Sequence, residues 1–228
     1  RSAGDLWALS NALWWTQLGL LQLGRLEEAA GMAEEGEPLA IRLGHLGALM
    51  CVRRFSAFRE FMLTAHIDRF EEFARADMEL CRSADMPWVF FSYAYLGQAH
   101  FWRGRWKEAL EGFREAARLE VPGVHAGDAW GPLLYGRAYA GHRDAVLDML
   151  DERKGDLPRP GRANTLGSWF ILLAAVEGLA VLGQREEAAK LYPLTLEALN
   201  TSALVHWWFF GPVETYAGIA AACGSRWE

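Results

Sequence analysis

The chain has 228 residues, of which 52% are hydrophobic and 23% are charged, and its formal net charge is −6. This composition is typical of an ordered globular protein and excludes an intrinsically disordered chain. The negative charge would repel the phosphate backbone of nucleic acids, so we expect no nucleic-acid partner.

The three cysteines, Cys51, Cys81 and Cys223, are odd in number and lie far apart in apolar sequence. This arrangement favours reduced thiols in a core over a disulfide framework. The first residues also lack the pattern of a signal peptide. We therefore expect a cytoplasmic protein.

Apolar residues recur at helical spacing along most of the chain, and no segment has the pattern of a convincing strand. The spacing predicts five helix pairs and one additional helix: 5–23 with 25–43, 46–65 with 68–84, 88–103 with 105–119, 127–140 with 142–153, 164–182 with 184–199, and 203–223. Asn164 with Thr165, and Thr201 with Ser202, are expected to cap the helices that they precede.

Prolines mark the expected breaks in these helices. Pro38 and Pro193 are expected to interrupt their helices, and Gly211-Pro212 to kink or break the last one, because proline lacks an amide donor and clashes with the preceding turn. The loop KGDLPRPGRA, residues 154–163, is the longest loop. It is the one place where a sub-boundary is expected within a single domain covering residues 1–228.

One six-residue motif occurs three times, as GRLEEA at 24–29, GRWKEA at 104–109 and GQREEA at 183–188. Weaker copies are DRFEEF at 68–73 and AGHRDA at 140–145. The glycine is expected to end one helix in the left-handed conformation, and the alanine to let the next helix approach closely. A motif that recurs at this spacing indicates stacked helix pairs.

The third unit, FFSYAYLGQAHFWRGRWKEALEGFREAARLEVP, resembles a tetratricopeptide repeat. Tyr93 stands at the Trp position, Leu96-Gly97 at the Leu-Gly pair, and Ala109 and Phe113 at the Ala and Phe of the second helix. The resemblance is partial at 10–43 and 169–200, and poor at 54–87. It implies an all-α fold, a right-handed superhelical solenoid of antiparallel helix pairs. The units it implies are about 5–43, 46–84, 88–121, 127–153, 164–199 and a partial unit at 203–228.

Residues 164–228 resemble the C-terminal helical region of large bacterial signalling proteins. Those proteins carry a class III nucleotide cyclase or DNA-binding output domain and a signalling ATPase before their repeats. The resemblance implies a regulatory, partner-binding segment and carries over no catalytic residue. Because the chain begins without Met and stops after SRWE, we expect it to be a piece of a larger protein.

The motifs of common catalytic and cofactor sites are missing from the sequence. It contains no HExxH, CxxC, GxxxxGK[ST] or GxSxG pattern, so we expect no enzyme, no metal and no cofactor. The apolar segment 166–183 contains Glu177 and is interpreted as a buried helix, so no membrane partner is expected.

In tetratricopeptide repeats the first helices line a concave groove, and the residues that point into it follow from their positions in each unit. These positions select Trp14, Gln22, Phe58, Met62, His66, Phe91, Gln98, Phe101, Trp102, Trp130, Arg137, Phe170 and Glu177. Aromatic side chains mixed with polar ones are typical of an interaction surface, so a protein or peptide partner is expected there. Burial of these residues between irregular units is the alternative interpretation.

Two functions remain open for such a groove. A partner-binding module requires an open groove that continues across units. A sensor of a small-molecule effector, which would control an attached ATPase, cyclase or transcriptional output, requires a closed aromatic pocket. Trp102 is the expected binding anchor, whereas Trp106, at the elbow, is expected to support the fold. The residues 207–210 are expected to cause self-association, because the last helix lacks its partner.

Overall fold

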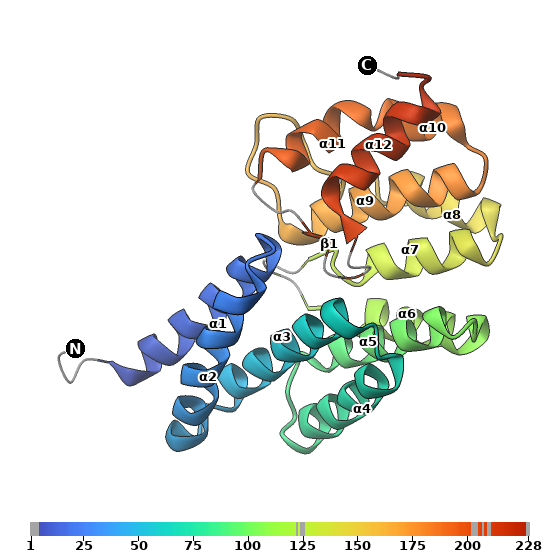
Figure 1. The fold of residues 1–228 in the computed structure, drawn as a ribbon. Coiled ribbons are helices and arrows are strands. Elements are labelled where there is room, and N and C mark those ends of the chain that lie inside the picture. The colour runs from blue at the N-terminus through green and yellow to red at the C-terminus, as the bar shows by residue number, and fades with distance from the viewer. Residues whose placement is uncertain are drawn as a thin grey trace. The chain divides into compact units, whose positions relative to one another are not determined.

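The computed structural model describes residues 5–121, 123, 126–201, 205–206, 208 and 211–226. These residues form helices that pack on their neighbours, which confirms the predicted all-α class, and one short strand pair (Figure 1). The helices are α1 (Leu6–Gln22), α2 (Leu26–Leu43), α3 (Leu46–Thr64), α4 (Ile67–Ser83), α5 (Val89–Trp102), α6 (Trp106–Leu119), α7 (Trp130–Tyr139), α8 (Arg143–Glu152), α9 (Leu166–Val181), α10 (Arg185–Lys190), α11 (Tyr192–Leu199) and α12 (Val213–Cys223). Strands β1 (Val205–His206) and β2 (Gly211–Pro212) pair in antiparallel fashion.

The contacts divide the chain into two compact units, residues 1–73 and 74–228, with the division inside α4. The first unit therefore contains α1, α2, α3 and the first turns of α4. The second unit contains the remaining elements, and the loop 154–163 lies inside it.

The first unit has an aromatic core. Helix α2 packs against both α1 and α3, and α1 also contacts α3. The ring centroid of Phe55 lies 6.2 Å from that of Trp14 and 6.2 Å from that of Phe58. Phe70 of α4 extends the series, 6.0 Å from Phe58. This contact and the ring pair Phe61–Phe70, at 5.1 Å, join the first turns of α4 to α3.

Four elbows end their first helix in the same way. Gly24, Gly104, Gly141 and Gly183 have φ of 70°, 71°, 77° and 73°, in the left-handed region that glycine adopts at little cost. The residue after each glycine donates its amide proton to a carbonyl five residues earlier, at 2.8–2.9 Å. The prediction that this glycine ends the helix is therefore confirmed for all three full copies of the motif.

The elbow after α3 places an alanine in the left-handed conformation instead. Ala65 has φ 52° and donates its amide proton to the Phe61 carbonyl at 2.8 Å. A residue with a Cβ atom is strained by roughly 1–2 kcal/mol in this conformation. Glycine removes that strain, but it also raises the conformational entropy of the unfolded chain, which offsets part of the stabilisation. We expect Ala65→Gly to raise the free energy of unfolding by about 0.5–1 kcal/mol, measured by urea unfolding.

The reciprocal control for Ala65 lies at the end of α2. Gly44 has φ 64°, so Gly44→Ala should destabilise the chain where Ala65→Gly stabilises it. Shifts of the same sign in the two variants would contradict the left-handed assignment.

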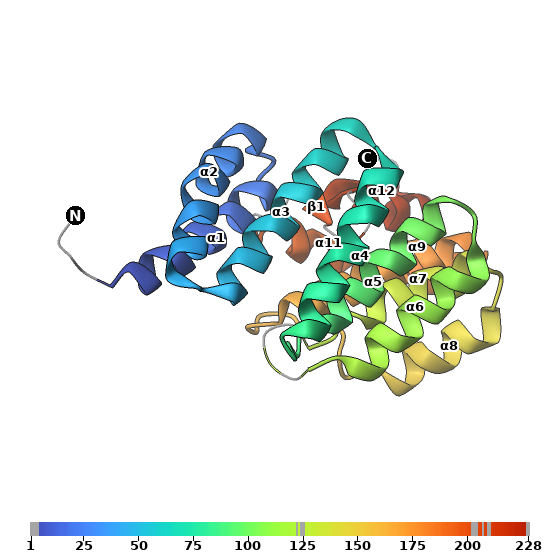
Figure 2. The ribbon, with the colours of Figure 1, turned by 90° about the horizontal axis from the view of Figure 1, so that it is seen from below.

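In the second unit, α5 and α6 lie side by side with their backbones in contact (Figures 1 and 2). A Cβ atom on Gly112 would lie 2.9 Å from the Tyr93 carbonyl oxygen and 3.0 Å from the Cα of Gly97. Phe113 is fully buried, and Cβ atoms on Gly97 and on Gly136 of α7 would lie 2.7 and 2.9 Å from its ring. Because these two glycines lack a Cβ atom, the Phe113 ring has room to pack between α5 and α7.

Helix α9 is the centre of the C-terminal part of the second unit. It packs against α7, α10, α11 and α12 (Figure 1). The residues from 170 to 176 are each at most 2% exposed, so the helix has almost no solvent face in this stretch. Among the residues that the structure describes, no helix is both long enough and apolar enough to cross a membrane.

Two helix predictions are wrong. Helix α2 runs without a break through Pro38, because its contacts with α1 and α3 hold the turns on either side of the missing amide donor. The helix predicted over 203–223 begins only at Val213, after β1 and β2. Pro193 does interrupt its helix as predicted, since α10 ends at Lys190 and α11 begins at Tyr192.

The predicted caps have different outcomes. Thr165 caps α9, because its hydroxyl oxygen accepts the Ser168 amide proton at 3.1 Å. Thr201 precedes no helix, and its hydroxyl donates to the Ala198 carbonyl at 2.7 Å. Ser202 lies outside the described residues.

Trp208 is buried in the second unit and adds nothing to an exposed surface. Its ring lies 6.0 Å from Phe91 and 5.4 Å from Tyr95, and 1% of the residue is exposed. The apolar side of α12, with Val213 and Tyr216, is also buried, in a cluster with residues of α9 and α11. The other three residues of the stretch 207–210 lie outside the described part of the chain, so self-association through them stays a prediction.

Candidate functional site

Four aromatic side chains gather where α5, α6 and α7 meet. The buried ring of Phe101 lies 5.1 Å from Trp106, in an edge-on arrangement, and 5.0 Å from Tyr135. It also meets Tyr139 edge-on at 5.4 Å, and the two tyrosine rings are 4.6 Å apart. Phe101 and Tyr135 are buried, whereas Trp106 and Tyr139 are 42% and 37% exposed. A buried pair of rings thus supports two rings at the surface.

A pocket of about 490 Å³ opens beside these two exposed rings. We call it the Trp106–Tyr139 pocket. Its lining residues come from one face of α6, from the end of α7 and from the elbow that follows: Trp106, Lys107, Leu110, Arg114, Tyr139, Ala140 and His142. Its size lies within the range of small-molecule sites, roughly 300–1,000 Å³.

A carboxylate of α9 fixes the rings of α7. The Glu177 carboxylate accepts hydrogen bonds from the Tyr135 hydroxyl at 3.1 Å and from the Tyr139 hydroxyl at 2.6 Å. Burial, followed by the hydrogen bond to Glu177, raises the pKa of Tyr139 to about 12. Burial also raises the pKa of Tyr135. Both hydroxyls are therefore protonated donors at neutral pH, and the exposed ring of Tyr139 keeps one orientation.

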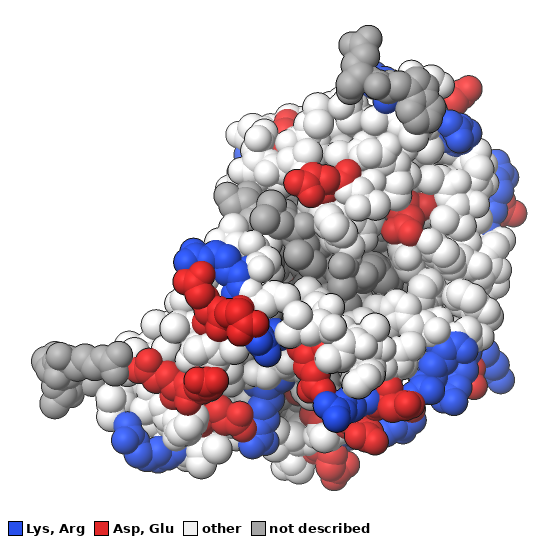
Figure 3. Space-filling view, in the orientation of Figure 1, with Lys and Arg blue, Asp and Glu red and all other residues white. Residues whose placement is uncertain are grey.

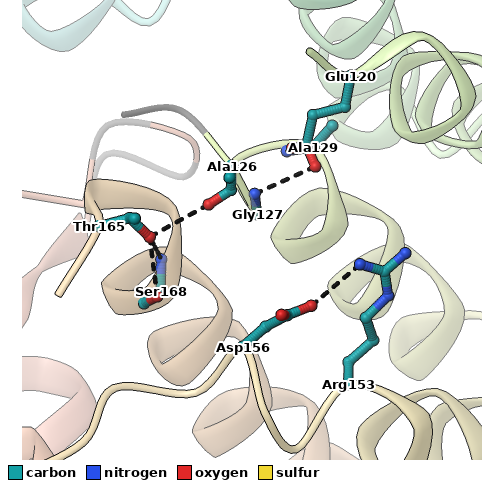
Figure 4. Close-up of polar contacts among 8 residues, drawn as sticks. All are labelled: Glu120, Ala126, Gly127, Ala129, Arg153, Asp156, Thr165 and Ser168. Atoms are coloured by element: carbon teal, nitrogen blue, oxygen red, sulfur yellow. Dashed lines mark hydrogen bonds and ion pairs between the residues drawn. The ribbon is translucent and has the colours of Figure 1, made fainter. Parts of the chain in front are cut away.

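A second polar cluster anchors the start of α7 (Figure 4). The Glu120 carboxylate, at the end of α6, accepts the amide protons of Gly127 at 3.1 Å and Ala129 at 2.7 Å. The Thr165 hydroxyl of the α9 cap donates to the Ala126 carbonyl at 3.2 Å. The segment 126–129 is therefore bound to α6 on one side and to α9 on the other.

The end of α8 is attached to the same region. The Arg153 guanidinium lies 3.6 Å over the Trp130 ring. It also pairs with the Asp156 carboxylate at 3.0 Å (Figure 4). Because α7 is held at its first turn by these contacts and those of Glu120, the tyrosines at its other end are held in place beside the pocket.

Glu120 predicts a pH dependence of stability. Burial, the largest cause, raises its pKa above the ordinary value of 4.5, although the two amide donors act in the opposite direction. A raised pKa means that the stabilising contribution is full below the unfolded pKa and is lost as pH rises through the folded pKa. We therefore expect the free energy of unfolding to fall over the pH range above about 4.5 because of this group.

The variant Glu120→Gln should remove this component. The difference in the free energy of unfolding between wild type and Glu120→Gln, measured in urea at a series of pH values, should shrink as pH rises. Glu111→Gln, at an exposed position of α6, is the matched control. A wild-type-minus-variant difference that stays constant with pH would contradict the burial of Glu120.

The structure places the thirteen predicted groove residues in three kinds of environment. Six are buried: Trp14, Phe58, Phe91, Gln98, Phe101 and Phe170. Six are half-buried: Gln22, Met62, Trp102, Trp130, Arg137 and Glu177. His66 is exposed. The six buried side chains belong to the core of the chain, as the alternative interpretation allowed.

Only part of the predicted set comes together. Phe101 and Glu177 meet at the tyrosines of α7, beside the pocket. Arg137 points to α8, where its guanidinium donates to the Ala145 carbonyl at 3.3 Å, and Trp130 also faces the end of α8. Trp102 packs half-buried on the core, so its role as an anchor stays a prediction.

The exposed lining of the pocket was not selected from the sequence. Tyr139 is not among the predicted groove residues, and Trp106 is expected from the sequence to support the fold. The spacing of Tyr135 and Tyr139, four residues apart, places both on one face of a helix and was an available signal. Lys107 and Arg114, seven residues apart, share a face of α6 for the same reason.

Among the described residues, no group of three or more His, Cys, Asp or Glu side chains is arranged to hold a metal ion. No protein-family model, curated protein or solved structure matches this chain.

Proposed function

We propose that the chain is a non-catalytic helical-repeat module that binds a protein or peptide partner, built as a right-handed superhelical solenoid of the tetratricopeptide kind. The four identical glycine elbows support the repeat. The packing of Phe113 against Gly97 supports the tetratricopeptide type, because both residues stand at the positions of that pattern. The proposed setting is the regulatory segment of a larger cytoplasmic signalling protein of bacterial origin.

The observation that carries the binding role is the Trp106–Tyr139 pocket. Exposed aromatic rings on a rigid support are the commonest anchors of binding energy, because they bury a large area at a small cost in conformational entropy. Phe101 and the Glu177 hydrogen bond hold these two rings in place without a ligand. The site is therefore formed before a partner arrives.

The test is a selection of random peptides on the immobilised 228-residue chain. We expect the selection to enrich peptides that bind the wild type. Their binding free energy should weaken by at least about 2 kcal/mol when the chain carries Trp106→Ala. Trp15→Ala, at a ring of α1 that is also largely exposed, is the control and should bind as the wild type does. Circular dichroism would show that both variants keep their helices. A failure to enrich any peptide, or equal binding by Trp106→Ala, would contradict the proposed role.

A second function is supported by the extent of the pocket. Its lining residues belong to α6, to the end of α7 and to the elbow that follows, so it is confined to the join of two neighbouring units. A local pocket with an aromatic wall favours a small-molecule effector. In that case the module would be a sensor that controls an attached ATPase, cyclase or transcriptional output.

A further inference from the structure

The rim of the Trp106–Tyr139 pocket is cationic. Lys107 and Arg114 extend from α6, and His142 lies at the elbow before α8. All three are exposed, and neither Lys107 nor Arg114 forms an ion pair with any residue that the structure describes. A chain with a net charge of −6 therefore keeps two unpaired cations beside one pocket.

No acidic side chain is among the residues that line this pocket. Glu108 and Glu111 lie between Lys107 and Arg114 on α6, and both are exposed and outside the pocket lining. Asp144 pairs with Arg143, at 3.6 Å. Figure 3 shows Lys and Arg side chains gathered over the end of α5 and α6, with acidic side chains beside them. Lys107 and Arg114 both belong to the pocket lining, where a bound anion would meet them.

The interior of the pocket is apolar and flat-sided. Leu110 is buried at its base, and the rings of Trp106 and Tyr139 form its exposed walls. Both rings meet the buried Phe101 edge-on, so the wall positions are set by the core. Aromatic walls of this kind favour a flat apolar body, which can stack on a ring or meet its edge.

We infer that the Trp106–Tyr139 pocket binds an organic anion with a flat apolar body, such as an aromatic carboxylate or sulfonate. The rings take the flat body, and Lys107 and Arg114 hold the anionic group at the rim. Charge attraction at a partly enclosed site is stronger than at an open surface, because less water screens it. This inference rests on the second proposed function, effector binding.

The experiment compares two fluorescent probes that differ by one charged group. The first is anilinonaphthalene sulfonate, and the second is phenylnaphthylamine, which has the same rings without the sulfonate. We expect the sulfonate probe to saturate a single site on the full chain, with an affinity that falls as salt is added. In Lys107→Glu/Arg114→Glu its affinity should fall at least about tenfold, while the neutral probe binds as before.

A matched pair of charge reversals controls for net charge. Arg159→Glu/Arg162→Glu changes the net charge equally at two exposed positions of the loop 154–163, and should leave both probes unaffected. Glu111→Gln removes one of the two acidic groups between the cations, Glu108 and Glu111, and should tighten binding of the sulfonate probe. Melting temperatures would show that each variant remains folded.

The outcomes separate the two proposals. If Trp106→Ala weakens both probes but the Lys107→Glu/Arg114→Glu variant binds the sulfonate as the wild type does, the effector site stands and the anion preference is wrong. If Trp106→Ala leaves both probes unchanged, the pocket binds no ligand and both proposals are wrong. Tyr139→Ala replaces Trp106→Ala should the latter lower the melting temperature.

Discussion

Replacing Phe113 with alanine is expected to lower the free energy of unfolding by about 3–5 kcal/mol, the largest effect of any substitution considered for this chain. The ring is fully buried and contacts both α5 and α7 at glycines, so its removal leaves a cavity between two helices that cannot close easily. Urea unfolding of Phe113→Ala, with Glu111→Ala as an exposed control on the same helix, would measure the difference. A loss below about 1 kcal/mol would contradict the packing described for this crossing.

The glycine that faces this ring gives a coupled test. Gly97→Ala places a Cβ atom 2.7 Å from the Phe113 ring, so it should destabilise the chain by roughly 1–3 kcal/mol through overpacking. In a Phe113→Leu background the same substitution should cost less, because the smaller side chain leaves room. Additive losses in the double variant would mean that the two positions do not touch.

The elements that the sequence predicts well are those decided by local backbone preference. The glycine of each elbow could be predicted because few residues other than glycine adopt a left-handed φ at little cost. The environment of Phe113 could also be predicted, because the spacing of Gly97, Ala109 and Phe113 matches a known packing pattern. Both predictions depend on residues close together in the chain.

The direction in which the first helices face could not be predicted in the same way. Helix α5 carries buried residues such as Phe91, Gln98 and Phe101, and α9 is buried on almost every side around Phe170. A helix that is apolar all round has no periodicity to show which side meets solvent. The positions of a regular repeat therefore do not separate surface residues from core residues in these helices.

The candidate site depends on tertiary contacts that the sequence does not show. Trp106 is exposed and Trp102 half-buried, because the first residue of α6 extends beyond the crossing while the last of α5 packs on the core. The join of Tyr139 to Glu177 connects residues 38 positions apart. Such contacts follow from how α7 and α9 lie against each other, which the apolar pattern of either helix leaves open.

The placement of α7 against α9 depends in turn on a glycine at the start of α9. A Cβ atom on Gly167 would collide with the carbonyl oxygen of Ala126 and lie 2.6 Å from the Asp128 amide nitrogen. Both obstacles are backbone atoms, which cannot move aside as the end of a side chain can. The segment 126–129 that carries them is held by Glu120 and by Thr165.

Gly167→Ala is therefore expected to lower the free energy of unfolding by about 1–3 kcal/mol, or to displace this segment. Gly218→Ala is the matched control, because no atom lies within 4 Å of the Cβ it would add to α12. That variant should gain roughly 0.5–1 kcal/mol from helix propensity. Hydrogen exchange distinguishes a loss of stability from a displacement of the segment. Displacement would break the hydrogen bonds from the Gly127 and Ala129 amides to Glu120, so these two amides would lose their protection. Unchanged stability together with unchanged protection in Gly167→Ala would show that the segment 126–129 and α9 are not in backbone contact there.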